Sequence, residues 1–334
     1  MLELNGGKHN GSIGVRVKRN VLTLWLVNIG VIASFGQPAP VSFAETFEGK
    51  PSPRYSRGVL VARDPKNTTI YLIRPGKSND KIDIRLPAGG TFYIYDADLT
   101  PKGDIVSVGS LQSGGGIGGA MLLTNPSSGQ TRVILTDAFR PFRVTATDRS
   151  EIIVAGVEFD ESSRPKAGAG ILRRYNEVGI LNGSFLPVET IQHPSASLME
   201  SRLVYGNDRI VFLSQRDSKI VVLDADLNVL SISALPKHMI EHNLGSSCAI
   251  AKSTLFCTVS RISRATVPLA HETAILALDL PHMTLYDVSD LIGLNDKDAP
   301  VLAGSDGSQL VIRKKVPGMI VWTDVPTAES GLKL

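Results

Sequence analysis

The sequence predicts an all-β protein, a six-bladed β-propeller of four-stranded antiparallel blades. Turn clusters followed by short apolar runs recur about every 45 to 58 residues, and helix signals are scarce after the N-terminal stretch. A sixth copy begins near Val59, and the other turns are Lys102-Gly103-Asp104, Asp148-Arg149-Ser150, Asn207-Asp208, Lys252-Ser253 and Asp306-Gly307-Ser308. Repeats of this period that are made of strands are typical of propellers.

The two ends of the repeat look incomplete. The first unit has only a weak inner strand within residues 42–55, and the last unit ends after its third strand, near Asp324. Closed propellers often build one blade from both termini, which removes exposed sheet edges. We therefore expect the N- and C-terminal segments to pair and close the ring. Seven blades are the alternative, because residues 45–55 are hard to assign.

The N-terminal stretch has the pattern of an export signal. Four basic residues precede the apolar run 21–35, and small-residue sites follow it. This order is typical of a secretory signal peptide, with cleavage expected after Gly36, Ala39 or Ala44. A membrane anchor is the alternative, but about 15 apolar residues interrupted by Asn28 fall short of the roughly 20 that span a bilayer.

These features divide the chain into four parts. We assign 1–44 to the signal peptide and leader, 45–57 to a linker or closing strand, 58–325 to the propeller and 326–334 to a C-terminal tail. No later segment is apolar and long enough to span a membrane. A secreted or periplasmic location follows, and we expect a monomer.

The charge is nearly balanced, with a net value of +3 over 334 residues. A nucleic-acid partner would need a concentrated basic stripe, and the sequence has none. We therefore expect a protein or small-molecule partner and no nucleic acid.

The two cysteines predict a disulfide within one blade. Pairing around a turn at Lys252-Ser253 places Cys248 opposite Cys257 and Ala249 opposite Phe256. Directly opposed residues on antiparallel strands are close enough for a disulfide, and an exported chain meets an oxidising environment. Two buried free thiols are the alternative.

The segment 219–226, a strand followed by an aspartate and a turn, resembles the blades of the six-bladed β-propeller superfamily, including NHL-like proteins of bacterial envelopes. The resemblance covers about residues 55 to 325. It implies a propeller fold and a function among binding scaffolds, lactonases, lyases and sensors.

Three blades have long links between their second and third strands. These B–C links are 110–119, 158–170 and 260–272. In a propeller they emerge on the same face as the connections between blades, and insertions confined to one face of a repeat usually mark the binding face. Tolerated surface variation is the alternative.

Histidines predict a possible metal site at this face. His238 and His242 lie on one connection between blades, and His271 ends the long link of the fifth unit. Converging imidazoles and carboxylates suit a divalent metal. The H-x-x-E-H match at 238–242 lacks the large α/β context of the inverted zincin proteases, because Pro236 precedes it and a strand follows a few residues on. Solvated loop histidines are the alternative.

An anionic ligand is the other candidate at this face. Arg140 and Arg143 begin the third blade, and His193 lies on the connection that follows it. Guanidinium groups bind carboxylate and phosphate, although arginine stems can also simply cover apolar surface.

The sequence leaves two candidate functions. The G-x-G-x-x-G match at 114–119 precedes a strand and not a helix, so it does not predict a nucleotide site. G-x-S-x-G is absent, and no catalytic residue or cofactor is assigned. We favour an exported binding or scaffold protein without catalysis. The alternative is a metal-dependent propeller hydrolase, lactonase or lyase.

Overall fold

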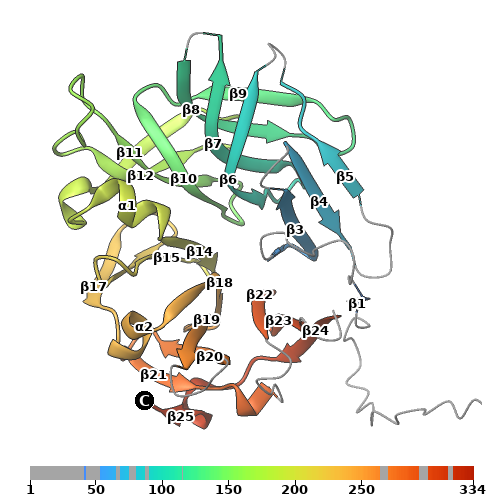
Figure 1. Ribbon diagram of the computed structural model, residues 1–334, viewed down its shortest axis with the longest axis vertical. Coiled ribbons are helices and arrows are strands. Elements are labelled where there is room, and N and C mark those ends of the chain that lie inside the picture. Colours follow the sequence, from blue (N-terminus) through green and yellow to red (C-terminus); the bar gives the residue numbers. More distant parts are fainter. Residues whose placement is uncertain are drawn as a thin grey trace, which may run out of the picture. The chain divides into compact units, whose positions relative to one another are not determined.

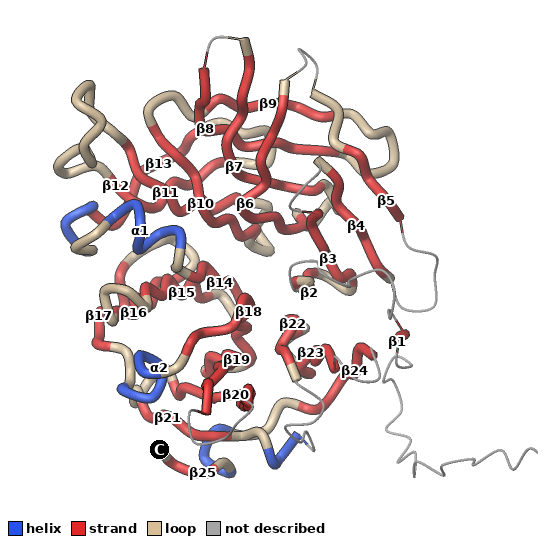
Figure 2. Tube along the Cα trace, in the orientation of Figure 1, coloured by secondary structure: helices blue, strands red, loops and turns tan. Residues whose placement is uncertain are grey.

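The chain forms six separate antiparallel sheets that succeed one another in chain order (Figure 1). The computed structural model describes residues 41–42, 53–64, 68–74, 80–86, 90–114, 116–263, 270–292, 300–314 and 319–334. Strands dominate these residues, with only short helical turns between them (Figure 2). The predicted all-β six-bladed propeller is confirmed, and the seven-bladed alternative is wrong.

The first three blades are simple meanders in which each strand pairs with the next. The first blade consists of β2 (Arg54–Ser56), β3 (Val59–Asp64), β4 (Thr69–Ile73) and β5 (Asp80–Asp83). The second consists of β6 (Thr91–Leu99), β7 (Ile105–Ser113), β8 (Gly116–Thr124) and β9 (Thr131–Leu135). The third consists of β10 (Phe139–Ala146), β11 (Ile152–Glu158), β12 (Gly170–Tyr175) and β13 (Leu181–Pro187).

The fourth blade follows the same plan, the fifth has an added outer strand, and the sixth takes its outer strand from the N-terminal segment. The fourth consists of β14 (Arg202–Gly206), β15 (Arg209–Ser214), β16 (Lys219–Asp224) and β17 (Val229–Ala234). The fifth consists of β18 (Asn243–Ala251), β19 (Thr254–Ser263), β20 (Ala270–Asp279) and β21 (Thr284–Asp287), joined by β25 (Leu332–Lys333). The sixth consists of β22 (Val301–Ser305), β23 (Gln309–Lys314), β24 (Met319–Asp324) and β1 (Val41–Ser42).

Short helices lie in the connections. The two α-helical turns are α1 (Pro194–Met199), before the fourth blade, and α2 (Lys237–Glu241), before the fifth. The 3-10 turns are η1 (Val188–Thr190), η2 (Asp290–Ile292) and η4 (Ala328–Ser330). None of the helices in the described part of the chain is long and apolar enough to cross a membrane.

The N-terminal strand β1 lies on the outer edge of the sixth blade, where Val41 pairs with Ile320 of β24. This pairing involves only two residues, so closure of the ring through the terminal segments stays a prediction. The rest of the leader, and with it the cleavage site, lies outside the described residues. The domain boundaries therefore also stay predictions.

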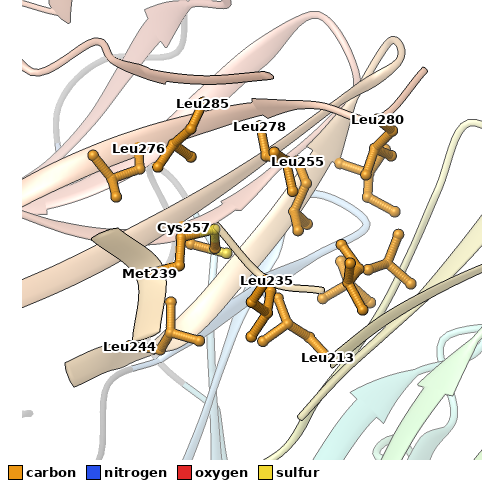
Figure 3. Packing of buried hydrophobic residues seen from close by; sticks show 14 of the residues in the cluster. Leu213, Leu235, Met239, Leu244, Leu255, Cys257, Leu276, Leu278, Leu280 and Leu285 are labelled. Atoms are coloured by element: carbon orange, nitrogen blue, oxygen red, sulfur yellow. The ribbon is translucent and has the colours of Figure 1, made fainter. Parts of the chain in front are cut away.

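The hydrophobic core is divided into six clusters, and each cluster fills the space between two neighbouring blades. The cluster between the fourth and fifth blades contains Leu213 and Leu235 from the fourth blade and Leu255 and Leu276 from the fifth (Figure 3). The cluster between the sixth and first blades contains Leu60 and Trp322. Burial of apolar surface is the main favourable term in folding, so the blades are stabilised chiefly against one another.

Gly304 allows the sixth and first blades to approach closely. A Cβ atom at this position would lie 2.8 Å from the carbonyl oxygen of Tyr55 and 2.7 Å from its Cβ. Contacts this short do not occur in folded proteins, so only glycine fits without a backbone shift.

The three long B–C links differ in structure. In the second blade, β7 and β8 continue as a paired hairpin to Ser113 and Gly116, so most of 110–119 is strand. In the fifth blade, β19 and β20 likewise pair as far as Ser263 and Ala270. Only the link of the third blade is mainly loop. Cross-strand pairing satisfies the backbone hydrogen-bonding groups of such extensions. The polar and glycine-rich composition of these segments does not predict this pairing.

The disulfide is confirmed. Cys248 of β18 pairs directly with Cys257 of β19, with their Cα atoms 4.2 Å apart, and Ala249 pairs with Phe256. Cys257 lies in the core cluster between the fourth and fifth blades. The bond therefore joins the innermost strand of the fifth blade to its neighbour.

Loss of this disulfide should destabilise the protein modestly. In the Cys248→Ser/Cys257→Ser variant we expect the free energy of unfolding to fall by about 2 kcal/mol, because the bond closes only a short loop. Urea unfolding of the variant and of the wild type, each with and without reductant, measures this difference. A reductant effect on the variant as large as that on the wild type would contradict the assignment.

Candidate functional site

A cavity of about 550 Å³ lies where the inner strands of the blades begin. We call it the mouth cavity, and side chains from the first five blades line it: Arg54, Arg63, Tyr95, Asp96, Arg143, Met199, Glu200, Arg202, Leu203, Val204, Gln215, Leu244, Ser247 and Cys248. Arg63 lies near the end of the second strand of its blade, and Glu200 lies just before an inner strand. The cavity therefore opens on the face that carries the B–C links.

One repeated position supplies four of the lining residues. In blades two to five, the inner-strand residues Leu99, Ala146, Tyr205 and Ile250 pair with the fully buried residues Ile105, Ile152, Ile210 and Leu255. Three residues before each of them stand Asp96, Arg143, Arg202 and Ser247, and all four line the mouth cavity. The repeat thus places a side chain of variable chemistry at the same height in each blade.

β-Bulges precede this position in the second and third blades. The register shifts between Ile94 and Asp96, and again between Pro141 and Arg143. The extra residues are Tyr95 and Phe142, whose rings stack with centroids 5.8 Å apart. A bulge redirects the side chains that follow it, so these two bulges help to aim Asp96 and Arg143 at the cavity.

Arg143 and Arg202 each reach across to the next blade. The Nε of Arg143 donates to the carbonyl of Ser201 at 2.8 Å, and its Nη2 donates to the carbonyl of Met199. The Nε of Arg202 donates to the carbonyl of Gly245 at 2.8 Å, and its Nη2 donates to that of Leu244 at 3.1 Å. These bonds fix both guanidinium groups in place at the cavity wall.

Arg63 makes a similar link from the first blade to the second. Its Nη1 donates to the carbonyl oxygen of Ile94 at 2.7 Å and also to that of Tyr95. Arg63 and Arg202 are therefore bound by backbone carbonyls of the next blade, and Arg143 by carbonyls of the connection that leads into the next blade.

Arg54 differs because it has carboxylate partners. Its guanidinium lies 3.2 Å from the buried Asp98 and 3.9 Å from Asp96, and it also donates to the carbonyl of Val144 at 2.8 Å. Arg54 lines both the mouth cavity and a second cavity of about 250 Å³ formed mainly by the turns between first and second strands. Its side chain therefore lies between the two cavities.

The positively charged side chains of the mouth cavity outnumber the carboxylates that lie close to them. Among the residues that the structure describes, no carboxylate oxygen lies within 4.0 Å of a guanidinium nitrogen of Arg63, Arg143 or Arg202. Burial, with the nearby charge of Arg143, lowers the pKa of Arg202 to about 10. Burial also lowers the pKa of Arg143. Both shifts have the direction expected for cations that lose water, and the nearby charge of Asp96, with that of Glu200 at Arg202, opposes them only in part.

The second cavity has a more mixed charge. Arg57 lies 2.5 Å from Asp148 and donates to the carbonyls of Leu99 and Ala146, each at 3.1 Å. Burial, reinforced by the charges of Asp148 and Asp208, raises the pKa of Tyr205 to about 12. Cations there are paired with carboxylates, in contrast to those of the mouth cavity.

Of the residues predicted to bind an anion, Arg143 alone lies in the mouth cavity. Arg140 is exposed and lies over the ring of Phe159, 4.9 Å from its centroid. His193 is the exposed residue that precedes α1. Neither of these two lines the cavity.

The predicted metal residues are only partly described. His238 belongs to α2 and His242 follows it, and their rings are 6.2 Å apart in an edge-on arrangement. The backbone of His271 pairs with Ile262 in the fifth blade, but its side chain lies outside the described residues. Within the part of the chain that is described, no group of three or more histidine, cysteine, aspartate or glutamate side chains could hold a metal ion.

Sequence reasoning missed Arg54, Arg63 and Arg202. Arg202 carries a signal that could have found it, because it stands at the same distance before its turn as Arg143 does. Arg54 and Arg63 have no such signal, since they reach the cavity from a short inner strand and from the end of a second strand.

Comparisons with known proteins support the fold. No protein-family model matches the chain, and no curated protein matches it. The solved structure of YjhT is similar over 86% of this chain and 96% of that chain, with 10% identity and a TM-score of 0.50. At this identity the likeness concerns the fold alone.

Two enzymes are among the other similar structures. A virginiamycin B lyase from Staphylococcus aureus matches 86% of this chain and 99% of its own, with 10% identity and a TM-score of 0.47. A gluconolactonase from Xanthomonas campestris matches 82% of this chain and 86% of its own, with 12% identity and a TM-score of 0.46.

The Arg54–Asp98 pair should matter for stability. In Arg54→Met we expect the free energy of unfolding to fall by about 3 kcal/mol, because the substitution leaves the buried Asp98 carboxylate without its cation. The Arg54→Met/Asp98→Asn variant should recover part of this loss. Arg140→Met, which removes a cation from the exposed surface, should change stability by less than about 0.5 kcal/mol. Urea unfolding measures all three, and an Arg54→Met variant as stable as the wild type would refute the role of the pair.

Proposed function

We propose that the chain is an exported β-propeller that binds a ligand in its mouth cavity and carries out no chemistry there. The observation that carries the proposal is the cavity itself, whose volume of about 550 Å³ is typical of small-molecule sites. Its arginines are fixed by hydrogen bonds to neighbouring blades, as in a site whose polar groups are held ready before the ligand arrives.

The position of the cavity also supports binding. It opens on the face where the second, third and fifth blades carry their longest B–C links. Loops on one face of a repeat protein commonly take part in recognition. These links would surround whatever occupies the cavity.

The lining chemistry favours binding over proton transfer. The charged groups around the cavity are mainly guanidiniums, which remain protonated at neutral pH even where burial lowers the pKa of Arg202 to about 10. Such groups supply positive charge and hydrogen-bond donors. They are poorly suited to act as general bases.

Export is the second part of the proposal. The basic and apolar N-terminal pattern predicts a signal peptide, and the Cys248–Cys257 disulfide suits an oxidising compartment. A secreted or periplasmic location agrees with both, and we propose a monomer that binds a small molecule or a protein.

Blocking the cavity tests the binding proposal. Met199 lies at the cavity and its side chain is exposed, so Met199→Trp should obstruct the opening without disturbing the core. Fluorine NMR with a library of anionic, neutral and cationic fragments measures binding to the mature protein. We expect the fragments that bind the wild type to bind the variant at least about fivefold more weakly.

The matched control places the same ring in the other cavity. Asn207 is exposed and lines the second cavity, so Asn207→Trp should leave fragment binding unchanged. Fragments that bind Met199→Trp as well as the wild type, or that lose affinity only for Asn207→Trp, would place the binding site elsewhere.

A metal-dependent hydrolase, lactonase or lyase is the second candidate. The close approach of His238 and His242 favours it, with His271 as the third proposed ligand. Metal analysis of purified mature protein, with His242→Ala beside it, decides this point. Stoichiometric metal that is lost in the variant would support the enzyme. A metal-free, fully stable wild type would rule out this metal site.

A further inference from the structure

We infer that the mouth cavity binds the oxyanion group of a small molecule, a carboxylate or a phosphate, between Arg143 and Arg202 with Arg63 as a further cation. This inference rests on the proposed use of the cavity for binding. It adds the chemical class of the ligand and the residues that recognise it.

The first step is the charge balance of the cavity. Four arginines line it, against two acids, Asp96 and Glu200. Asp96 is 3.9 Å from Arg54, and Glu200 is 3.5 Å from Arg216, which is not among the lining residues. Neither acid lies within 4.0 Å of the three arginines that remain, as far as the described residues show.

Uncharged side chains also join neighbouring blades. Asn207 donates to the carbonyl of Lys252 at 2.8 Å, and Gln215 donates to that of Met239 at 3.1 Å. Neutral amides therefore suffice to join neighbouring blades. Arg57 and Arg54 do carry charge, but each has a carboxylate within 3.2 Å.

Joining the blades therefore does not require the positive charges of Arg63, Arg143 and Arg202. Desolvating a cation without a counter-charge is unfavourable, and Arg143 and Arg202 are close enough for each to oppose the charge of the other. An anion in the cavity would remove both costs. This is the arrangement expected of a site whose counter-ion arrives with the ligand.

The second step is the number of donors that stay available. A guanidinium has five N–H groups. Arg143 uses three of them for carbonyls, one each of Ser201, Phe142 and Met199. The bonds of Arg63 to Ile94 and Tyr95 both come from one terminal nitrogen, Nη1. Arg202 uses four of them, for the carbonyls of Gly245, Leu244, Glu200 and Ser201. Donors of Arg63 and Arg143 and one of Arg202 therefore remain for an oxyanion, which accepts charge-assisted bonds from forked guanidiniums.

Titration calorimetry at low salt tests the inference. The probes are inorganic phosphate and citrate, with glucose as the neutral and putrescine as the cationic comparison. We expect one citrate or phosphate to bind per chain, more weakly as salt is added, and no binding of glucose or putrescine. The tighter of the two anions identifies the oxyanion, because citrate offers carboxylates alone.

Single substitutions locate the site. Arg143→Gln and Arg202→Gln should each weaken anion binding at least about tenfold. Arg140→Gln is the matched control, because it removes the same charge from the same inner strand as Arg143 but outside the cavity. It should keep the wild-type affinity within about twofold.

Folding is controlled separately, because Arg143 and Arg202 also join blades. Arg63→Gln provides a third variant from a different strand, and circular dichroism with thermal unfolding shows whether each variant is folded. If Arg143→Gln or Arg202→Gln does not fold, Arg63→Gln decides, with an expected loss of at least about fivefold. In the wild type, citrate or phosphate should also raise the unfolding temperature, since a ligand of the native state stabilises it.

The outcomes separate this inference from the proposed function. If fragments bind in the mouth but are neutral or cationic, the binding function stands and the inference is wrong. If neither anion binds, or if folded Arg63, Arg143 and Arg202 variants bind them as the wild type does, the inference is also wrong. Anion binding that Arg140→Gln weakens as much as Arg143→Gln would show only a general effect of surface charge, and would overturn it.

Discussion

The inner strand of each blade is an edge strand, and the fold depends on how its backbone groups are satisfied. Unpaired N–H and C=O groups are costly when they are removed from water. Here side chains of neighbouring blades bind them: Asp98 accepts from the amide of Ala146 at 3.0 Å, and Thr258 accepts from that of Leu302 at 2.7 Å. Arginines do the same for carbonyls. The ring is thus joined at its centre by polar bonds and farther out by six apolar clusters.

This arrangement links the architecture to the mouth cavity. Arg202 is held by backbone carbonyls of β18 and Arg63 by those of β6, so the positions of these two cations depend on the packing of two blades. Arg143 is held by the carbonyls of Met199, at the end of α1, and of Ser201, just before β14. A site built on strands is held more precisely than one built on loops. None of the three long B–C links supplies a lining residue, and most of the charged groups belong to strands.

The sequence predicted the fold in the places where a local pattern carries the information. The repeat of turns and apolar runs gave six blades, and counting residues back from the turn at Lys252-Ser253 gave the Cys248–Cys257 pair. The structure of the long links was harder to predict, because the glycine-rich sequence of the paired extensions of β7 and β8 is also typical of a loop. Glycines there relieve steric conflict, as at Gly119, where a Cβ would meet the carbonyl oxygen of Phe139 at 2.4 Å.

The site was less predictable because its chemistry depends on which residues meet across blades. Arg140 and Arg143 are the same type of residue on the same strand. A bulge between Pro141 and Arg143 changes the alternation of side chains along that strand. Arg143 lines the cavity, whereas Arg140 lies over Phe159. Arg63 comes from a different strand of a different blade, and the packing of the first blade against the second brings it to the same cavity. No spacing in the sequence predicts that Arg63 lies in the same cavity as Arg143.

A single position of the repeat explains how such a cavity acquires its chemistry. The second to fifth blades share an inner-strand position that holds Asp96, Arg143, Arg202 and Ser247 in turn, each three residues before a residue that pairs with the buried core. Because packing is set by the core residue, the mouth residue is free to differ from blade to blade. Two adjacent blades place arginine there, and their guanidiniums therefore meet at one wall of the cavity. The charge at this position therefore differs from blade to blade, and at Arg143 and Arg202 it is tied to the hydrogen bonds that these side chains make beyond their own blade.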